Sequence, residues 1–269
     1  MKKLPALLLA LCPLAALAHG DLHERIDALT AKLSRDPHNA ALYFQRGELH
    51  REHGEFSDAL ADFASAERVD PEHADVDFAR GRTCAEAKDA SGARAAFDRH
   101  LARHPDHAAA LLLRARCLVA LEDAERALAD FDRGLALTPD PQPDDYLARA
   151  GALVALGRVD DALRGLDEAM ARIGPAVPLV ARAIEVEAGA GQFEAALRRL
   201  DQAGLRAPRR ETWLEQRALI LRRAGRDAEA NAAAREALGL LDTLPASRRT
   251  TYTTGELEAR LRALIAASP

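Results

Sequence analysis

The sequence contains few aromatic residues, few strand-forming residues and no block of basic residues. Aromatic side chains make up 4% of the 269 residues, whereas alanine, leucine and arginine are abundant. This composition is typical of an all-helical protein. The net charge is −5, and a mildly acidic chain without basic blocks argues against nucleic acid as the main partner.

The short motifs that usually carry catalysis are also missing. The sequence has no nucleophile elbow, P-loop, Gly-x-Gly-x-x-Gly, His-Glu-x-x-His or Cys-x-x-Cys. Its many acidic residues stand three or four positions from arginines, which is the pattern of a solvated helix face. We therefore expect a protein that is not an enzyme and has no cofactor.

No apolar run is long enough to span a membrane, which takes about 20 residues. The apolar run 4–17 follows a positively charged start and ends in an Ala-x-Ala site. These features predict a signal peptide over residues 1–18, cleaved after Ala18, and export to a bacterial periplasm. The alternatives are an uncleaved anchor and a lipoprotein anchored at Cys12, against which the large Leu11 argues.

The dominant pattern is an alanine, a large apolar residue four positions later, and a proline eight or nine positions after that. The prolines from Pro71 to Pro208 step by 34, 34, 36 and 33 residues. Such a period indicates stacked helical hairpins, in which alanine allows close helix approach and proline ends the second helix. The copies are Ala59…Phe63…Pro71, Ala93…Phe97…Pro105, Ala127…Phe131…Pro139, Ala162…Leu166…Pro175 and Ala196…Leu200…Pro208, with a proline-free sixth copy at Ala230…Ala234.

Over residues 21–244 this pattern resembles the tetratricopeptide repeat family. The resemblance implies an all-α, right-handed α-solenoid of antiparallel helix pairs (a TPR superhelix) with N- and C-terminal capping helices. We expect one continuous solenoid rather than two domains. Residues 19–39 would form a half-repeat with a cap helix, and residues 245–269 a C-terminal capping helix. The six repeats are 40–73, 74–107, 108–141, 143–176, 177–210 and 211–244.

Apolar spacing predicts the two capping helices, one over residues 21–35 with Ile26, Leu29 and Leu33 on one face. The other covers residues 256–267, has Leu257, Leu261, Leu264 and Ile265 on one face, and takes Thr254 as its N-cap.

Within the repeats, one turn position needs a residue in the left-handed conformation. Repeats two and three have Lys88 and Glu122 there, so we expect these two turns to be built differently. The other four repeats have Gly54, Gly157, Gly191 and Gly225.

In the family, the first helices line a concave groove, and the fifth residue of each repeat usually faces it. Here the resemblance places a row of apolar residues at that position: Phe44, Phe78, Leu112 and Leu147. An exposed apolar row marks an interaction site, and it would hold an extended or helical apolar segment. The alternative is that neighbouring helices bury these side chains.

The ninth residue of each repeat is the second groove position, and here it is polar in the first three repeats. These residues are Glu48, Arg82 and Arg116. Two arginines on adjacent repeats could together bind a carboxylate or an acidic segment, or they could form ion pairs within the chain. Family members that clamp a chaperone's C-terminal carboxylate use Lys and Asn in the groove. These clamp residues are absent here, so we do not expect this chain to bind the C-terminal carboxylate of a chaperone.

Cys84 and Cys117 occupy core-type positions in first helices of adjacent repeats. We favour two buried thiols over a disulfide.

All nine histidines lie at or before His107. Cleavage after Ala18 would expose the amine and imidazole of His19, an arrangement that resembles the copper site of histidine-brace proteins, and His23 could add a ligand. Histidine pairs at i, i+3 or i, i+4, such as His100 with His104, can also share a metal. The competing explanation is ordinary turn and helix-end histidines, which we favour.

The sequence thus predicts a non-catalytic protein-interaction scaffold or adaptor of the bacterial cell envelope, which binds a protein or peptide segment in its groove. The alternative is a periplasmic copper- or zinc-handling protein that uses the histidine-rich N-terminal third. Self-association through exposed solenoid ends is a third hypothesis.

Overall fold

A computed structural model describes residues 14–204, 209–249 and 251–267 of the chain. Side chains are described from residue 22 onward within these ranges, except that of Tyr252. The described residues form fifteen helices and no strand, which confirms the predicted all-α class. Among the described helices, none is both long and apolar enough to cross a membrane.

Twelve of these helices form six consecutive pairs joined by short turns. The pairs are α2 (Ala40–His53) with α3 (Phe56–Val69), α4 (Val76–Glu86) with α5 (Ala90–Arg103), α6 (Ala108–Ala120) with α7 (Ala124–Leu137), α8 (Pro143–Ala155) with α9 (Val159–Ile173), α10 (Val177–Gly189) with α11 (Phe193–Gly204), and α12 (Arg210–Arg223) with α13 (Asp227–Asp242). The remaining helices are α1 (Leu14–Leu33), α14 (Ala246–Arg249) and α15 (Tyr252–Ala266).

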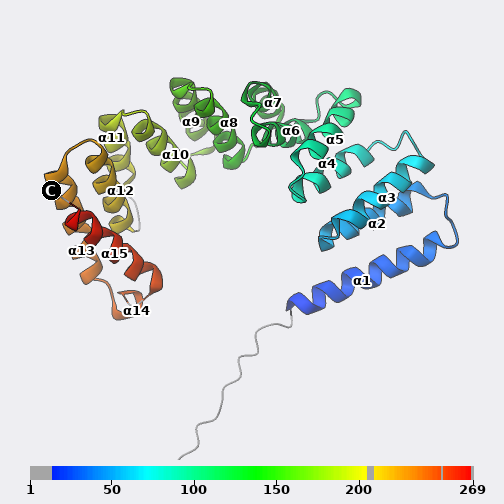
Figure 1. Cartoon of the computed structure of the whole chain (residues 1–269), viewed down its shortest axis with the longest axis horizontal. Helices are drawn as coiled ribbons and strands as arrows, with labels where there is room; N and C mark the ends of the chain where they lie inside the picture. Colours follow the sequence, from blue (N-terminus) through cyan, green and yellow to red (C-terminus); the bar gives the residue numbers. More distant parts are fainter. Residues whose placement is uncertain (1–13, 205–208, 250, 268–269) are drawn as a thin grey trace, which may run out of the picture. The chain divides into compact units, whose positions relative to one another are not determined.

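The chain divides into two compact units, Met1–Pro139 and Asp140–Pro269. In unit 1 each second helix packs against its own first helix, α3 and α5 also pack against the first helix that follows, and α2, α4 and α6 contact one another in turn. In unit 2 the helices from α8 to α13 also pack each on the next, and α15 follows them and packs on α12 and α13 (Figure 1). Each unit is therefore a stack of helix pairs, which is the solenoid arrangement.

The repeated alanine and phenylalanine form the core of unit 1. Phe63, Phe97 and Phe131 are completely buried, and burying each such side chain stabilises the fold by about 1.5–3 kcal/mol. The first helix makes room for the ring by carrying glycine. A Cβ placed on Gly81 would lie 2.5 Å from Cε1 of Phe97, and one on Gly47 would lie 2.8 Å from Cε1 of Phe63.

The turns of repeats two and three are built like the others, so the prediction that they would differ is wrong. Lys88 and Glu122 adopt the left-handed conformation, with φ of 63° and 60°. The next N–H then donates to the carbonyl five residues back, as the N–H of Asp89 does to Cys84 at 2.8 Å. Gly54 is followed by the same bond, from the N–H of Glu55 to His50 at 2.8 Å. The turn hydrogen bonds impose this backbone on a residue that takes it only at a cost.

Helix α1 covers the free side of α2 and buries Leu29 and Leu33, as predicted. The helix begins at Leu14, earlier than predicted. Residues 1–13 of the predicted signal peptide lie outside the described residues, and the side chains of residues 14–18 are not described either.

At the other end, α15 packs on α12 and α13 and buries Leu257 and Leu261 completely. The predicted N-cap is wrong, because Thr251 caps the helix and accepts a hydrogen bond from the N–H of Thr254. Thr254 lies one turn inside and is buried, and its hydroxyl donates to the carbonyl of Arg248 at 2.9 Å.

Cys84 and Cys117 are free, buried thiols in one hydrophobic cluster with Phe97, which confirms the interpretation as core residues. Burial raises the pKa of both thiols, so both stay protonated and unreactive at neutral pH.

Candidate partner-binding surface

The predicted groove phenylalanines lie partly buried over the core of unit 1. The ring of Phe44 stacks on His73 with centroids 4.9 Å apart and lies 5.8 Å from Phe63. Phe78 repeats this arrangement one unit later, 4.7 Å from His107 and 6.0 Å from Phe97. Each phenylalanine therefore bridges its repeat's buried ring and the histidine that ends the same repeat.

The apolar row is not exposed at its third position. Leu112 is 8% exposed, and its Cδ2 lies 2.8 Å from where a Cβ on Gly134 would stand. Because Gly134 has no side chain, Leu112 packs closely against α7. The prediction of an exposed side chain is therefore wrong at this position. Leu147, in unit 2, is half-buried on α8.

Charged side chains link the first helices α2 and α4, and we call this set the charge ladder: Glu48, Arg51, Arg82 and Glu86. Arg51 contacts Glu48 at 3.0 Å and Glu86 at 2.8 Å, and its side chain is 9% exposed. Arg82 lies 3.6 Å from Glu48 and 5.9 Å above the Phe78 ring, and its side chain is 35% exposed. Of the two alternatives for Arg82, the structure shows pairing within the chain.

The third ninth-position residue, Arg116, is exposed on α6. Because α4 and α6 are in contact, Arg82 and Arg116 belong to adjacent first helices of unit 1. These two helices thus present cationic side chains where the predicted groove has its second polar position.

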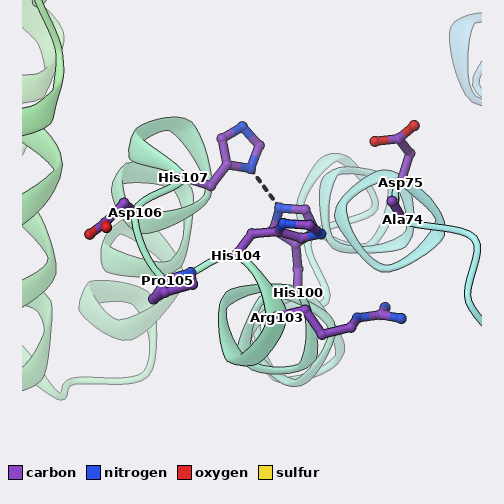
Figure 2. Close-up of a pocket in the computed structure, with 8 residues that line it drawn as sticks. All are labelled: Ala74, Asp75, His100, Arg103, His104, Pro105, Asp106 and His107. Atoms are coloured by element: carbon purple, nitrogen blue, oxygen red, sulfur yellow. Dashed lines mark hydrogen bonds between the residues drawn. The ribbon is translucent and has the colours of Figure 1, made fainter.

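An open recess of about 530 Å³ lies at the turn from α5 to α6. Its lining residues are Ala74, Asp75, His100, Arg103, His104, Pro105, Asp106 and His107. Figure 2 shows His107 facing His100 across the turn, where Nε2 of His100 and Nδ1 of His107 are 2.6 Å apart. One ring donates and the other accepts, so at least one is neutral. Arg103 is engaged by the buried carboxylate of Asp77.

This histidine pair favours its neutral form. Burial lowers the pKa of His100, and the nearby His107 and His104 lower it further. Burial and His104 likewise lower the pKa of His107. The His100–His107 pair is therefore mainly neutral at physiological pH and takes up protons only in acid.

Sequence reasoning missed a row of arginines that positions the first helices. Arg46 donates to both carboxylate oxygens of Asp62 on α3, at 2.7 and 2.8 Å. Arg114 does the same to Asp130 on α7 and also reaches Asp98 of the preceding repeat at 2.8 Å. The signal was an arginine at the seventh position of five repeats: Arg46, Arg80, Arg114, Arg149 and Arg217.

Of the predicted metal candidates, His23 is exposed on α1, and its ring lies edge-on to His53 with centroids 4.5 Å apart. The side chain of His19 lies outside the described residues.

The comparisons agree with this architecture. The family model described as tetratricopeptide repeat matches residues 44–103 and 89–142. Residues 44–142 of the chain thus match tetratricopeptide repeats. No curated protein matches it in sequence. Stacked repeats of this family form protein-interaction surfaces, so the chain is an interaction scaffold in that general sense, with a typically non-catalytic fold.

Solved structures share the fold of this repeat protein at low sequence identity. A tetratricopeptide repeat protein from Parabacteroides merdae is 18% identical, with a TM-score of 0.59, covering 91% of this chain and 94% of that one. PilW, described as a widely conserved type IV pilus biogenesis factor, is 19% identical, with a TM-score of 0.56 and coverage of 81% and 97%. A structure of Naa15/Naa10 bound to HypK-THB is 18% identical, with a TM-score of 0.54 and coverage of 93% and 37%.

Proposed function

We propose that this chain is a scaffold or adaptor of the bacterial cell envelope that holds an acidic protein or peptide segment against helices α4 and α6 of unit 1. The observation that carries the proposal is the pair of cationic side chains, Arg82 and Arg116, on adjacent first helices. The planar guanidinium group of arginine matches a carboxylate with two parallel hydrogen bonds.

The charge ladder can release Arg82 to a partner at little cost. The 3.6 Å separation of Arg82 from Glu48 is long for an ion pair, and Glu48 keeps a closer partner in Arg51 at 3.0 Å. Partly exposed pairs of this kind contribute about 0–1 kcal/mol. A partner carboxylate can therefore replace Glu48 beside Arg82 without leaving a buried charge unpaired.

The packing of Phe44 and Phe78 changes the role that the sequence suggested for them. Their rings rest on buried phenylalanines and on turn histidines, so they support the surface and offer only their outer edges to a partner. Truncating them would disturb the fold together with binding, whereas reversing the charge of Arg82, which is partly exposed, and of Arg116, which is exposed, leaves the core intact.

The envelope setting rests on the predicted signal peptide and on the likeness in fold to PilW, a pilus biogenesis factor by its description. Exported chain should be recovered from the periplasmic fraction with His19 as its first residue. Replacing Ala18 by leucine should block processing. Recovery of unprocessed wild-type chain from the cytoplasm would contradict this part of the proposal.

Selecting peptides from a random display library on the purified chain tests the binding proposal. We expect the enriched sequences to contain Asp or Glu and to bind the Arg82→Glu/Arg116→Glu variant at least about tenfold more weakly, as expected for losing one or more charge-assisted contacts.

Arg68→Glu is the matched control, because Arg68 is an exposed arginine on the second helix α3. It should bind the selected peptides as the wild type does. Peptides without acidic residues, or peptides that bind the double variant and wild type equally, would show that this surface is not the binding site.

A further inference from the structure

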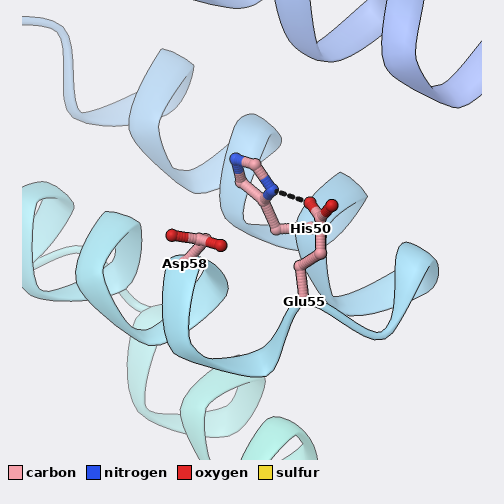
Figure 3. Close-up of side chains that lie close together, drawn as sticks. All are labelled: His50, Glu55 and Asp58. Atoms are coloured by element: carbon pink, nitrogen blue, oxygen red, sulfur yellow. Dashed lines mark hydrogen bonds and ion pairs between the residues drawn. The ribbon is translucent and has the colours of Figure 1, made fainter.

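Three potential metal ligands meet at the turn between α2 and α3 of the first repeat. His50, Glu55 and Asp58 each place one donor atom within 4.8 Å of the other two (Figure 3). Nδ1 of His50 already lies 2.6 Å from Oε2 of Glu55. An imidazole and two carboxylates are a donor set that suits borderline divalent transition metals.

Local structure brings the three side chains together. His50 stands in the last turn of α2, and Gly54 reverses the chain with φ of 83°. The N–H of Glu55 then donates to the carbonyl of His50 at 2.8 Å, which fixes the two residues beside each other. Asp58 follows three positions later in the first turn of α3, on the same side of that helix as Glu55.

The other repeats show that His50 replaces a core residue. Its equivalents in repeats three, four and six are buried leucines, Leu118, Leu153 and Leu221, and repeat two has the buried Cys84. Repeat five has a carboxylate there, Glu187, which Arg199 pairs at 2.9 Å. Only the first repeat places a metal-binding imidazole at this position.

The two carboxylates are equally unusual within this chain. In repeats three, four and six, the residues equivalent to Glu55 and Asp58 carry opposite charges and form ion pairs: Asp123–Arg126, Arg158–Asp161 and Arg226–Glu229. The first repeat instead places two negative charges three positions apart, at a helix N-terminus that favours acidic side chains.

Glu55 is oriented toward the imidazoles rather than toward its own helix. It stands at the N-cap position of α3 but makes no side-chain capping hydrogen bond. One carboxylate oxygen faces His50, and the other lies 2.9 Å from Nδ1 of His53. A second imidazole that holds a ligating carboxylate in place is a common outer partner of protein metal sites.

We propose that His50, Glu55 and Asp58 bind one divalent transition-metal ion of the zinc type, with His53 as a positioning residue for Glu55. A tetrahedral Zn²⁺ with bonds of about 2.1 Å holds its ligand atoms about 3.4 Å apart. The ligand atoms now lie within 4.8 Å of one another. Rotation of the exposed Asp58 side chain brings its carboxylate to the shorter distance, and water completes the coordination. The two carboxylates balance the charge of the ion.

The bound ion would link the end of α2 to the start of α3 in the repeat that α1 covers. Because the donors converge only in the folded chain, the ion stabilises that state. This site is separate from the proposed peptide surface on α4 and α6 and does not depend on it.

Zn²⁺ titration of the purified, metal-stripped chain, followed by calorimetry and by competition with a chromophoric chelator, tests the site. We expect tight binding at this site and a thermal midpoint that rises with Zn²⁺. His50→Leu should weaken binding roughly 100-fold or more and abolish the thermal shift, because it removes the only imidazole ligand. This variant should fold, since leucine fills the same position in three other repeats.

Two further measurements keep the result specific. Co²⁺ should give the visible absorption of a tetrahedral site in the wild type and not in His50→Leu. His38→Ala is the matched control, because His38 is exposed and outside the cluster; its affinity should equal that of the wild type.

The proposal is overturned if the wild type binds no Zn²⁺ or if folded His50→Leu binds it as the wild type does. Zn²⁺ binding that survives in His50→Leu but disappears in His104→Ala would place the ion at the α5–α6 recess and would equally overturn it.

Discussion

The two units of the chain use the same arrangement of helices with different chemistry. Unit 1 contains all nine histidines, and its second helices place Phe63, Phe97 and Phe131 in the core. Unit 2 has no histidine and uses Leu166 and Leu200 at the equivalent positions. The periodic pattern thus specifies the stack of helix pairs, whereas the side chains at the turns, such as the histidines of unit 1, differ between the units.

The polar contacts inside the units differ in the same way. In unit 2, Arg199 joins Asp167 at 2.6 Å to Glu187 at 2.9 Å and so connects α11 to α9 and α10. In unit 1, the turns are crossed by imidazoles, as between His100 and His107. Arginine stays charged throughout the physiological range whereas imidazole does not, so we expect only unit 1 to change its stability near neutral pH.

The largest effect should come from Phe97→Ala, which removes the ring that fills the core beside Gly81. We expect a loss of about 3–5 kcal/mol, as for other buried aromatic residues. Hydrogen exchange should report the loss in α4, α5 and α6, while α10 to α13 keep their protection. Equal loss of protection in both units would show that they unfold together and would contradict the claim that the two units differ in stability.

The next effect concerns close packing of the first helices. Gly81→Ala should destabilise the chain by about 1–3 kcal/mol, because the new methyl group would overlap Phe97. Gly151→Ala on α8 is the matched substitution in unit 2, where a Cβ has nothing within 4 Å. It should stabilise by about 0.5–1 kcal/mol. Urea unfolding of both variants measures the difference, and equal signs would contradict the packing argument.

Acid should weaken unit 1 selectively. Burial lowers the pKa of His100 and His107 in the folded state, so the unfolded chain takes up protons first. Their contribution is present above the unfolded pKa of about 6.5 and is lost as the pH falls through the lower folded values.

Thermal unfolding between pH 7 and pH 5, with hydrogen exchange to separate the units, checks the expected acid sensitivity. His107→Asn places a residue that is favourable at an N-cap at the start of α6 and should flatten the dependence. An unchanged pH profile in this variant, or the same sensitivity in unit 2, would contradict the assignment to the histidine pair.

The smallest effect lies in the turns. Lys88→Gly should stabilise the chain by about 0.5–1 kcal/mol. A side chain costs about 1–2 kcal/mol in the left-handed region, and the greater conformational entropy of glycine in the unfolded chain offsets part of the gain from removing it. Gly225→Ala, at the same turn position in unit 2, should destabilise by about 1 kcal/mol. Denaturant midpoints measure both changes, and stabilisation by Gly225→Ala would show that φ does not control these turns.

The sequence predicted the helical class, the buried thiols and the buried faces of the capping helices because each follows from a period or from apolar spacing. It could not predict the turn at Lys88, whose backbone is set by hydrogen bonds and not by the residue type. The burial of Leu112 depends on Gly134, which is 22 positions away in the chain and adjacent only in the fold.

The candidate surface was predicted in part. The pattern of the ninth positions identified Arg82 and Arg116, but the pairing of Arg82 with Glu48 requires knowing that α2 and α4 touch. The seventh-position arginines were visible as a periodic residue, although their acidic partners vary between the same and the preceding repeat. The cluster of His50 with Glu55 and Asp58 needed the turn geometry.

Photocrosslinking tests the central claim most directly. An acidic peptide from the display selection would carry a photoreactive group beside its Asp or Glu, and mass spectrometry would map the crosslinked residues on the unaltered chain. Our account predicts crosslinks on α4 and α6 near Arg82 and Arg116, reduced by an excess of unlabelled peptide. Competed crosslinks on the second helices α3, α5 and α7, or on unit 2, would contradict it.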